Sequence, residues 1–148
     1  MTDFGVVRTR RPGWTFAIAI VCIVLMSGCT DRSARLAQEM SAIQVTKTIQ
    51  AAEVQYYSQY GRYGSLKELG PPASGAPDAN GAGVLPADIA SGAKNGYKFR
   101  LSTESKGYQV IANPEQPGAG RSFYSDESMT IRQSSAGEAN AQSPAFGS

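Results

Sequence analysis

Apolar side chains recur at helical spacing in the first half of the chain. From Arg35 to Tyr60 there is neither glycine nor proline, and Gly61 follows. The stripe consists of apolar and aromatic residues that are mostly three or four positions apart: Leu36, Met40, Ile43, Val45, Ile49, Ala52, Tyr56, Tyr60 and Tyr63. Polar residues such as Gln50 fall largely on other parts of the helical wheel. This spacing predicts one long amphipathic helix that buries the stripe and ends at Gly61.

The pattern changes from helical spacing to alternation at Gly96. Apolar residues alternate with polar ones over 97–102 and again over 108–112, with a short polar loop between the two runs. Such alternation predicts two half-buried strands that form a hairpin. Two further short strands are expected at 121–124 and 128–132. The expected fold class is therefore α+β, with the long helix packed on an antiparallel sheet of three or four strands.

Three segments outside these elements have their own composition. Ser65, followed three residues later by Glu68, predicts a capped helical turn. Residues 70–95 are rich in Gly, Pro, Ala and Ser, so we expect a long surface loop with one short helix at 86–90. Residues 133–148 contain almost no bulky side chains, which predicts a disordered tail.

The first 28 residues have the parts of a secretory signal. Three arginines precede an uncharged apolar run, 14–26, which is shorter than the about 20 apolar residues of a spanning helix. The run leads into Leu25-Met26-Ser27-Gly28-Cys29, which resembles the lipobox of bacterial lipoproteins. The resemblance implies that residues 1–28 are removed by cleavage after Gly28 and that the thiol of Cys29 is joined to diacylglycerol. The alternative is an ordinary signal in which Cys29 stands by chance.

A second interpretation of the same region begins earlier in the chain. Residues 10–16, Arg-Arg-Pro-Gly-Trp-Thr-Phe, are similar to the end of a prepilin leader. The resemblance implies cleavage after Gly13, so that the mature chain would begin with Trp14 and continue as an apolar helix. Two features depart from that family: the fifth mature position is Ile18 instead of glutamate, and the apolar run is short.

The charge and cysteine content of the chain depend on the cleavage site. The whole chain has 14 Lys+Arg and 12 Asp+Glu. Cleavage before Cys29 leaves equal numbers of basic and acidic residues, so the lipid alone would hold the protein on the membrane, through the polar tether 29–35. Only one cysteine would remain, so no intrachain disulfide can form, and stability must come from the core of the domain 36–132. A near-neutral charge does not suggest a nucleic-acid partner.

Residues that could carry catalysis or bind a metal are scarce. The chain contains no histidine, which excludes His-dependent catalysis and His-containing metal sites. Asp126 and Glu127 are adjacent in an expected turn, whereas Glu39 and Glu53 are about 21 Å apart along the helix. Residues 78–81, Asp-Ala-Asn-Gly, resemble a fragment of a calcium loop without its later ligands, so a turn is expected. We therefore expect no catalytic residue, no metal site, no cofactor and no small-molecule substrate.

Four pieces of the sequence resemble, in the correct order, the headpiece of type IV pilins and type II secretion pseudopilins. One of them, Tyr-Gly-Arg-Tyr-Gly-Ser-Leu-Lys-Glu-Leu, is similar to the segment that follows the helix of these proteins. The four pieces are residues 37–56, 60–69, 91–99 and 120–132. A long helix, a variable loop and a small antiparallel sheet are also the layout of that headpiece. The resemblance implies a pilin-like α+β domain over 36–132.

These observations predict a non-enzymatic lipoprotein of the bacterial cell envelope that faces the periplasm or the exterior. We expect it to be held on the membrane by its lipid and to bind a protein of the envelope, a pilus or a secretion machine through the loop 70–95 and the sheet edge. The alternative is a minor type IV pilin or pseudopilin that enters a filament through residues 14–28. An enzyme is the third hypothesis, and it would require an activity that depends on Asp126 or Glu127.

Overall fold

The computed structural model describes the backbone of residues 14–147 and the side chains of residues 31–147. The chain divides into two compact units, Met1–Ala34 and Arg35–Ser148, and the second unit contains the hydrophobic core. The elements follow one another in the order α1 (Trp14–Tyr60), α2 (Leu66–Leu69), α3 (Ala87–Ala90), β1 (Ala93–Lys94), β2 (Tyr97–Glu104), β3 (Gly107–Pro114), β4 (Ser122–Asp126) and β5 (Arg132–Ser134). This arrangement of helix and sheet confirms the expected α+β class.

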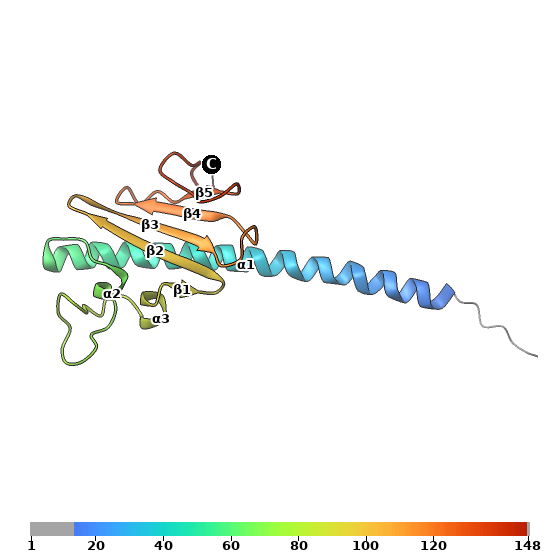
Figure 1. Cartoon of the computed structure of the whole chain (residues 1–148), viewed down its shortest axis with the longest axis horizontal. Helices are drawn as coiled ribbons and strands as arrows, with labels where there is room; N and C mark the ends of the chain where they lie inside the picture. The colour runs from blue at the N-terminus through green and yellow to red at the C-terminus, as the bar shows by residue number, and fades with distance from the viewer. Residues whose placement is uncertain (1–13, 148) are drawn as a thin grey trace, which may run out of the picture. The chain divides into compact units, whose positions relative to one another are not determined.

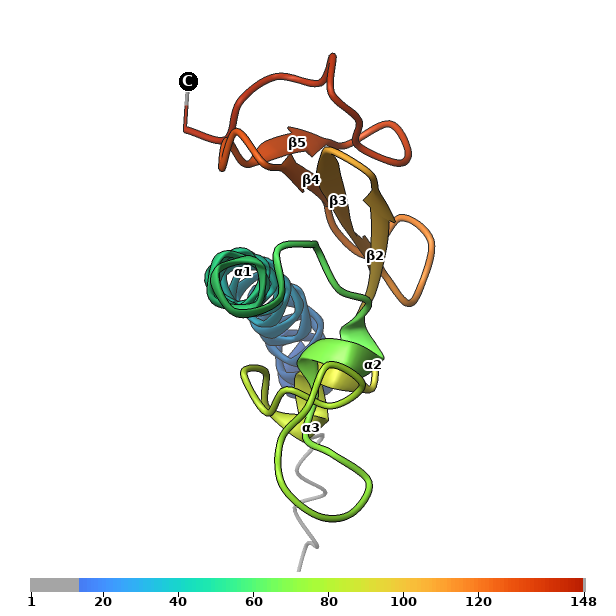
Figure 2. The same cartoon turned by 90° about the vertical axis from the view of Figure 1, so that its left-hand side faces the viewer.

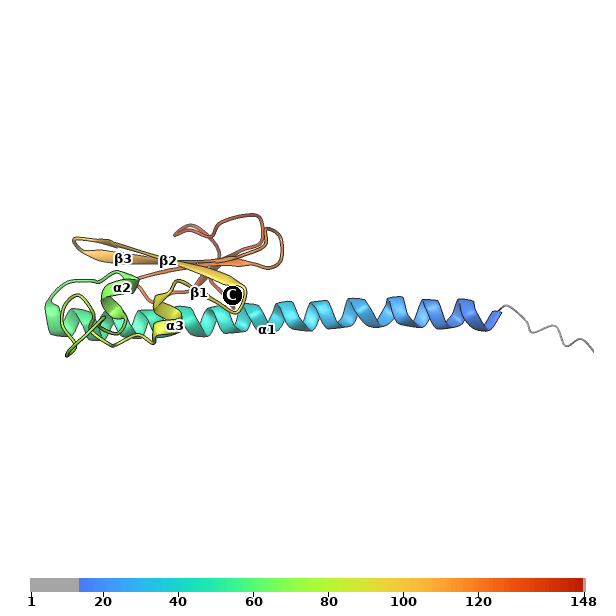
Figure 3. The same cartoon turned by 60° about the horizontal axis from the view of Figure 1, so that its bottom comes forward.

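The sheet is antiparallel, with the strand order β1-β2-β3-β4-β5. In the second unit, the sheet lies along one side of α1 (Figures 1 and 3), and α2 and α3 lie beside the same helix (Figure 2). The β2–β3 hairpin pairs Phe99 with Ala112 and Leu101 with Val110, as the alternation predicts. The expected number of strands, three or four, is wrong, because the sheet has five.

The two strands that differ from the prediction, β1 and β5, lie at the edges of the sheet. The two-residue strand β1 pairs with the start of β2 and was not predicted. The strand expected at 128–132 instead begins at Arg132, because the preceding residues form a turn. In that turn the Met129 N–H donates to the Asp126 carbonyl at 2.9 Å, and Met129 has a φ of 59°, which is incompatible with a strand.

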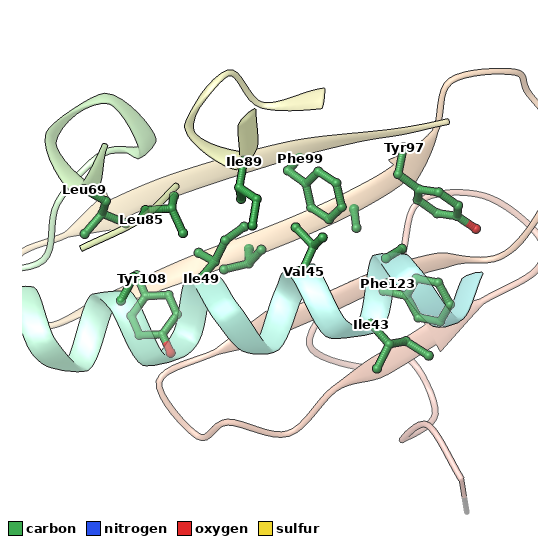
Figure 4. Packing of buried hydrophobic residues seen from close by; sticks show 14 of the residues in the cluster. Ile43, Val45, Ile49, Leu69, Leu85, Ile89, Tyr97, Phe99, Tyr108 and Phe123 are labelled. Carbon is green, nitrogen blue, oxygen red and sulfur yellow. The ribbon is translucent and has the colours of Figure 1, made fainter. Parts of the chain in front are cut away.

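The hydrophobic core lies between α1 and the inner face of the sheet. Figure 4 shows Val45 and Ile49 of α1 pointing toward the sheet, where Phe99, Tyr108 and Phe123 are buried. Alternate residues of β2, β3 and β4 supply this face, because side chains alternate between the two faces of a strand. The predicted stripe of α1 is thus confirmed in the part of the helix that the sheet covers.

Burial of α1 differs from the predicted stripe in two respects. Leu36 and Met40 belong to the stripe but are 56% and 45% exposed. Thr46, Gln50 and Glu53 are polar and buried, although Gln50 was expected off the buried stripe. The cause is that α1 is covered over a wide arc: Gln50 donates to the Ser125 hydroxyl of β4 at 2.5 Å, and the chain beyond Tyr60 folds back over Glu53.

The segment between α1 and the sheet is more ordered than a free surface loop. Ser65 and Glu68 form the predicted capping box, with each side chain accepting a hydrogen bond from the other's backbone N–H. Within residues 70–95, Leu85 and Ile89 are buried in the core, and α3 follows Pro86 as expected. Residues 78–81 form a turn in which the Asp78 carboxylate accepts the Asn80 N–H at 2.8 Å. The expected surface loop therefore also closes one side of the core.

Residues 133–147 pack against the sheet, which differs from the disordered tail that the composition predicts. Ala139 is fully buried, and Phe146 is half-buried against the core. Arg132 pairs with Ala145 in an isolated antiparallel bridge. Phe123 of β4 contacts Phe146 with their rings nearly perpendicular. The segment is ordered because one aromatic anchor and several backbone hydrogen bonds replace the bulk that its composition lacks.

Candidate interaction surfaces

The residues predicted for cleavage and lipidation lie in or before the first part of α1. Gly13 lies outside the described residues, and Trp14 is the first residue of α1. Gly28, Cys29 and the expected tether 29–35 fall within the same helix, and the side chains of Gly28 and Cys29 are outside the described set. Lipidation and both cleavage sites therefore stay predictions. Among the described residues, no helix reaches the length and apolar character that crossing a membrane requires.

The outer face of α1 carries most of the exposed large apolar side chains of the described domain. Leu36, Met40, Val54 and Tyr57 are each about half exposed, and Met129 in the β4–β5 turn is the fifth such residue. Leu36 and Val54 are separated by 18 residues, about five helical turns, so they project from the same side of α1. We call the set Leu36, Met40, Val54 and Tyr57 the α1 outer face. The sequence showed these residues as apolar, but it did not show that the sheet leaves them uncovered.

Glu53 is a fully buried carboxyl group on α1. Its Oε2 accepts the Gly64 N–H at 3.0 Å, and no described group donates to its Oε1. Burial raises the pKa of Glu53 to about 7; the Glu68 charge acts in the same direction, while the Gly64 N–H and the Arg62 charge lower the pKa. Glu53 therefore keeps its proton up to about pH 7, and its hydrogen bond with Gly64 joins α1 to the turn that follows.

Tyrosine rings surround this carboxyl group. Tyr63 contacts Tyr108 of β3 with their ring centroids 5.0 Å apart, and Tyr57 contacts Tyr63 at 4.8 Å. The buried Tyr108 hydroxyl has no hydrogen-bond partner among the described residues. Burial and then the Glu53 charge raise the Tyr108 pKa above its ordinary value. The cluster is a packed junction of α1, β3 and the 61–64 turn. Glu53 Oε1 and the Tyr108 hydroxyl, which are buried without hydrogen-bond partners in the described part of the chain, destabilise it.

Glu39 and Arg121 form the ion pair that joins the start of the domain's helix to β4. The Arg121 guanidinium donates to Glu39 Oε2 at 2.6 and 3.0 Å, and the Arg121 N–H donates to Oε1 at 2.9 Å. Burial acts to raise the pKa of Glu39, but the hydrogen bonds and charge of Arg121 outweigh it and lower the pKa. Glu39 is thus a structural carboxylate, distant from Glu53 as the sequence predicted.

Asp126 and Glu127 do not combine into an acid–base pair in the structure. Asp126 accepts hydrogen bonds from the Tyr124 hydroxyl at 3.2 Å and from Ser128. The Glu127 carboxylate lies instead over the backbone of Gly107, in a shallow pocket at the end of the β2–β3 hairpin. No group of three His, Cys, Asp or Glu side chains that could hold a metal ion occurs among the described residues.

The two edges of the sheet differ in what covers them. At one edge β1 is only two residues long, and Lys94 within it pairs with Asp88 of α3 at 2.5 Å. At the other edge Gln133 of β5 donates its N–H to the Pro144 carbonyl at 2.9 Å. Short strands and covered edges limit strand pairing with other chains. The sheet edge predicted as a contact surface is thus closed at the β5 end by residues of the same chain.

Comparison of the chain with models of protein families, with curated proteins and with solved structures gives no match.

Proposed function

We propose that this chain is a non-enzymatic, lipid-anchored protein of the bacterial cell envelope whose pilin-like domain acts through protein–protein contacts. The observation that carries this proposal is the α1 outer face. Its four apolar side chains are exposed on one side of α1, as two pairs about 21 Å apart along the helix, and exposed apolar side chains are typical of contact sites.

The form of the domain supports the pilin-like part of the proposal. One long helix buries its amphipathic face under an antiparallel sheet, and a compact segment of turns and short helices connects them. That order of elements is the one implied by the resemblance of residues 36–132 to pilin headpieces. Two of the four carboxylates considered for an enzyme are engaged in the structure: Glu39 pairs with Arg121, and Asp126 caps its own turn.

The anchoring part of the proposal depends on the residues around Cys29. The apolar run 14–26, the small pair Ser27-Gly28 and the cysteine that follows are the parts that lipidation requires. A single acyl chain gives weak and reversible membrane binding, whereas the additional chains of a fully modified lipoprotein would hold the domain stably.

A second candidate function is a filament subunit of a pilus or secretion machine. The feature that favours it is the resemblance of residues 10–16 to the end of a prepilin leader. Cleavage after Gly13 would leave a chain whose residues 14–60 form one continuous helix. In this alternative residues 14–28 stay on the protein and enter the filament.

The N-terminus of the membrane-purified protein distinguishes the two functions. We would determine by mass spectrometry the intact N-terminal peptide of the wild-type chain and of a Cys29→Ala variant. A diacylated peptide that begins at Cys29, absent from the variant, is the expected result. A peptide that begins at Trp14, unchanged by the substitution, would reject the lipoprotein and support the filament subunit.

Contact through the α1 outer face is tested by cross-linking in intact cells. A photo-reactive amino acid at Val54 should yield a discrete cross-linked protein. The same amino acid at Thr103, an exposed position on β2, serves as the matched control. Equal cross-linking from the two positions would contradict a specific contact at the α1 outer face.

A further inference from the structure

Residues 135–147, which we call the closing segment, contain a turn that is held by hydrogen bonds of their own. The Asn140–Ser143 turn is made entirely within the segment: the Ser143 N–H donates to the Asn140 carbonyl at 3.0 Å, and the Gln142 N–H donates to Asn140 Oδ1 at 2.9 Å. Asn140 also donates its own N–H to the Ser143 hydroxyl at 3.0 Å. The Asn140–Ser143 turn therefore needs no contact with the sheet for these hydrogen bonds.

The closing segment binds the β5 edge in the manner of an added strand. Gln133 donates its N–H to the Pro144 carbonyl at 2.9 Å, and Phe146 donates its N–H to the Ile131 carbonyl at 2.8 Å. The Arg132 guanidinium donates to the Ser143 carbonyl at 2.9 Å. Backbone hydrogen bonds of this kind give affinity for an extended segment, and a side-chain pocket gives selectivity.

Phe146 supplies the side chain that makes the docking of this segment selective. Its ring packs edge-on against Phe123, with centroids 6.1 Å apart, and the Arg121 guanidinium lies 5.6 Å from the centre of the same ring. Further along the segment, the Glu138 carboxylate accepts hydrogen bonds from Arg100 and Asn113 on the opposite face of the sheet. The closing segment thus contacts both faces of the sheet as well as its edge.

We propose that copies of this chain exchange the part of the closing segment that follows Gly137, so that residues 138–147 of one copy occupy the β5 edge and pack Phe146 against Phe123 and Arg121 of a second copy. All the contacts described above join the closing segment either to itself or to the sheet. The same contacts can therefore form between two chains, and only the connection near Gly137 must change. Gly137 has a φ of 140°, a conformation that favours glycine and suits a hinge.

A second copy is the occupant that we propose, because a segment that fits this edge is already part of every chain. Exchange of an identical element requires no new interface and is a low-cost route to dimers. Confinement on a membrane or in a filament would raise the local concentration of copies and favour exchange over closure within one chain. The inference applies equally to both candidate anchors.

Disulfide trapping in the full-length chain tests the exchange. Arg132 and Ala145 lie directly opposite each other, a position at which two cysteines in neighbouring antiparallel strands can bond. We would co-express an Arg132→Cys chain and an Ala145→Cys chain that carry different tags. We would then oxidise the membranes and identify the cross-linked peptides by mass spectrometry, which separates this bond from any made by the native cysteines. The expected result is a disulfide between residue 132 of one chain and residue 145 of the other.

Two controls make the result decisive. A Thr103→Cys chain paired with the Ala145→Cys chain reports random collision, and an Arg132→Cys/Ala145→Cys double variant reports whether the segment sits at the β5 edge. If the double variant closes within one chain while the mixed pair gives no more dimer than the Thr103 control, the exchange is refuted. The double variant's failure to form any 132–145 disulfide, within or between chains, would also refute it.

Phe146→Ala in the Ala145→Cys chain provides the final check. Loss of the Phe146 ring should reduce the mixed 132–145 disulfide several-fold, because the segment then loses its packing against Phe123. A dimer that persists at full yield without the ring would arise from another contact and would overturn the proposal. None of these outcomes depends on whether the N-terminus begins at Cys29 or Trp14, so this test and the test of the proposed function fail independently.

Discussion

The buried carboxyl group of Glu53 should make the stability of this domain decrease as the pH rises. Burial is the main cause that raises the Glu53 pKa to about 7, whereas its ordinary value is 4.5. In the unfolded chain the group ionises as the pH passes 4.5, but in the folded domain it keeps its proton until about pH 7. The stabilising contribution of Glu53 is therefore complete below pH 4.5 and is lost as the pH rises from there through 7.

The size of this effect follows from the difference between the two pKa values. Each pH unit of difference corresponds to about 1.4 kcal/mol, so the loss between pH 4.5 and pH 8 reaches an upper limit of about 3 kcal/mol. Glu53→Gln removes the charge but keeps a carbonyl oxygen that can accept the Gly64 N–H. The variant should equal the wild type near pH 4.5 and exceed its free energy of unfolding by up to about 3 kcal/mol at pH 8.

Urea unfolding of the full chain in detergent, followed by the near-ultraviolet circular dichroism of its tyrosines, measures this difference at a series of pH values. Glu104→Gln, which removes an exposed carboxylate at the end of β2, is the matched control and should leave the pH profile unchanged. If the difference in unfolding free energy between Glu53→Gln and the wild type is the same at pH 4.5 as at pH 8, the predicted effect of Glu53 is refuted.

Four further substitutions test other parts of the domain by urea unfolding at neutral pH, and one of them also in acid. Ile49→Ala should reduce the unfolding free energy by about 2–5 kcal/mol because it empties a fully buried site, whereas Leu36→Ala on the exposed helix face should change it by less than about 0.5 kcal/mol; equal losses would contradict the assigned burial. Ser65→Ala should cost about 1 kcal/mol through loss of the α2 cap, and no loss would mean that the cap contributes nothing. Glu39→Gln should cost about 2 kcal/mol at pH 7 through its hydrogen bonds to Arg121. Because the folded pKa of Glu39 is lowered, this cost should disappear as the pH falls below 4.5, and a difference that persists in acid would contradict it.

The elements that local patterns specify could be predicted from the sequence. The helical spacing of Val45, Ile49 and Tyr56 identified the buried stripe of α1, because a stripe three to four residues apart lies on one side of a helix. Alternation identified the β2–β3 hairpin, and the Ser65–Glu68 spacing identified the capping box. In each case the information lies in residues that are close in the sequence.

The features that were missed depend on contacts between distant residues. Burial of Gln50 requires Ser125, which is 75 positions away, and burial of Glu53 requires the chain to turn back at Gly64. A helical wheel places both residues beside the stripe but does not show how wide an arc the sheet and the turn will cover. The exposed positions of Leu36 and Met40 have the same cause, because the predicted stripe is longer than the cover.

The closing segment is the part of the domain whose order its composition predicts least well. Its contacts to β5 use the carbonyls of Ser143 and Pro144 and the N–H of Phe146, which almost any residue at these positions could supply. Bulk and periodicity therefore carry no signal of this packing, and Phe146 is the one side chain whose size marks an anchor. A segment held mainly through its backbone can therefore have the small polar composition that is also typical of disorder. A substitution of Phe146 therefore distinguishes an ordered segment from a disordered one. The same substitution also tests the exchange of closing segments most directly.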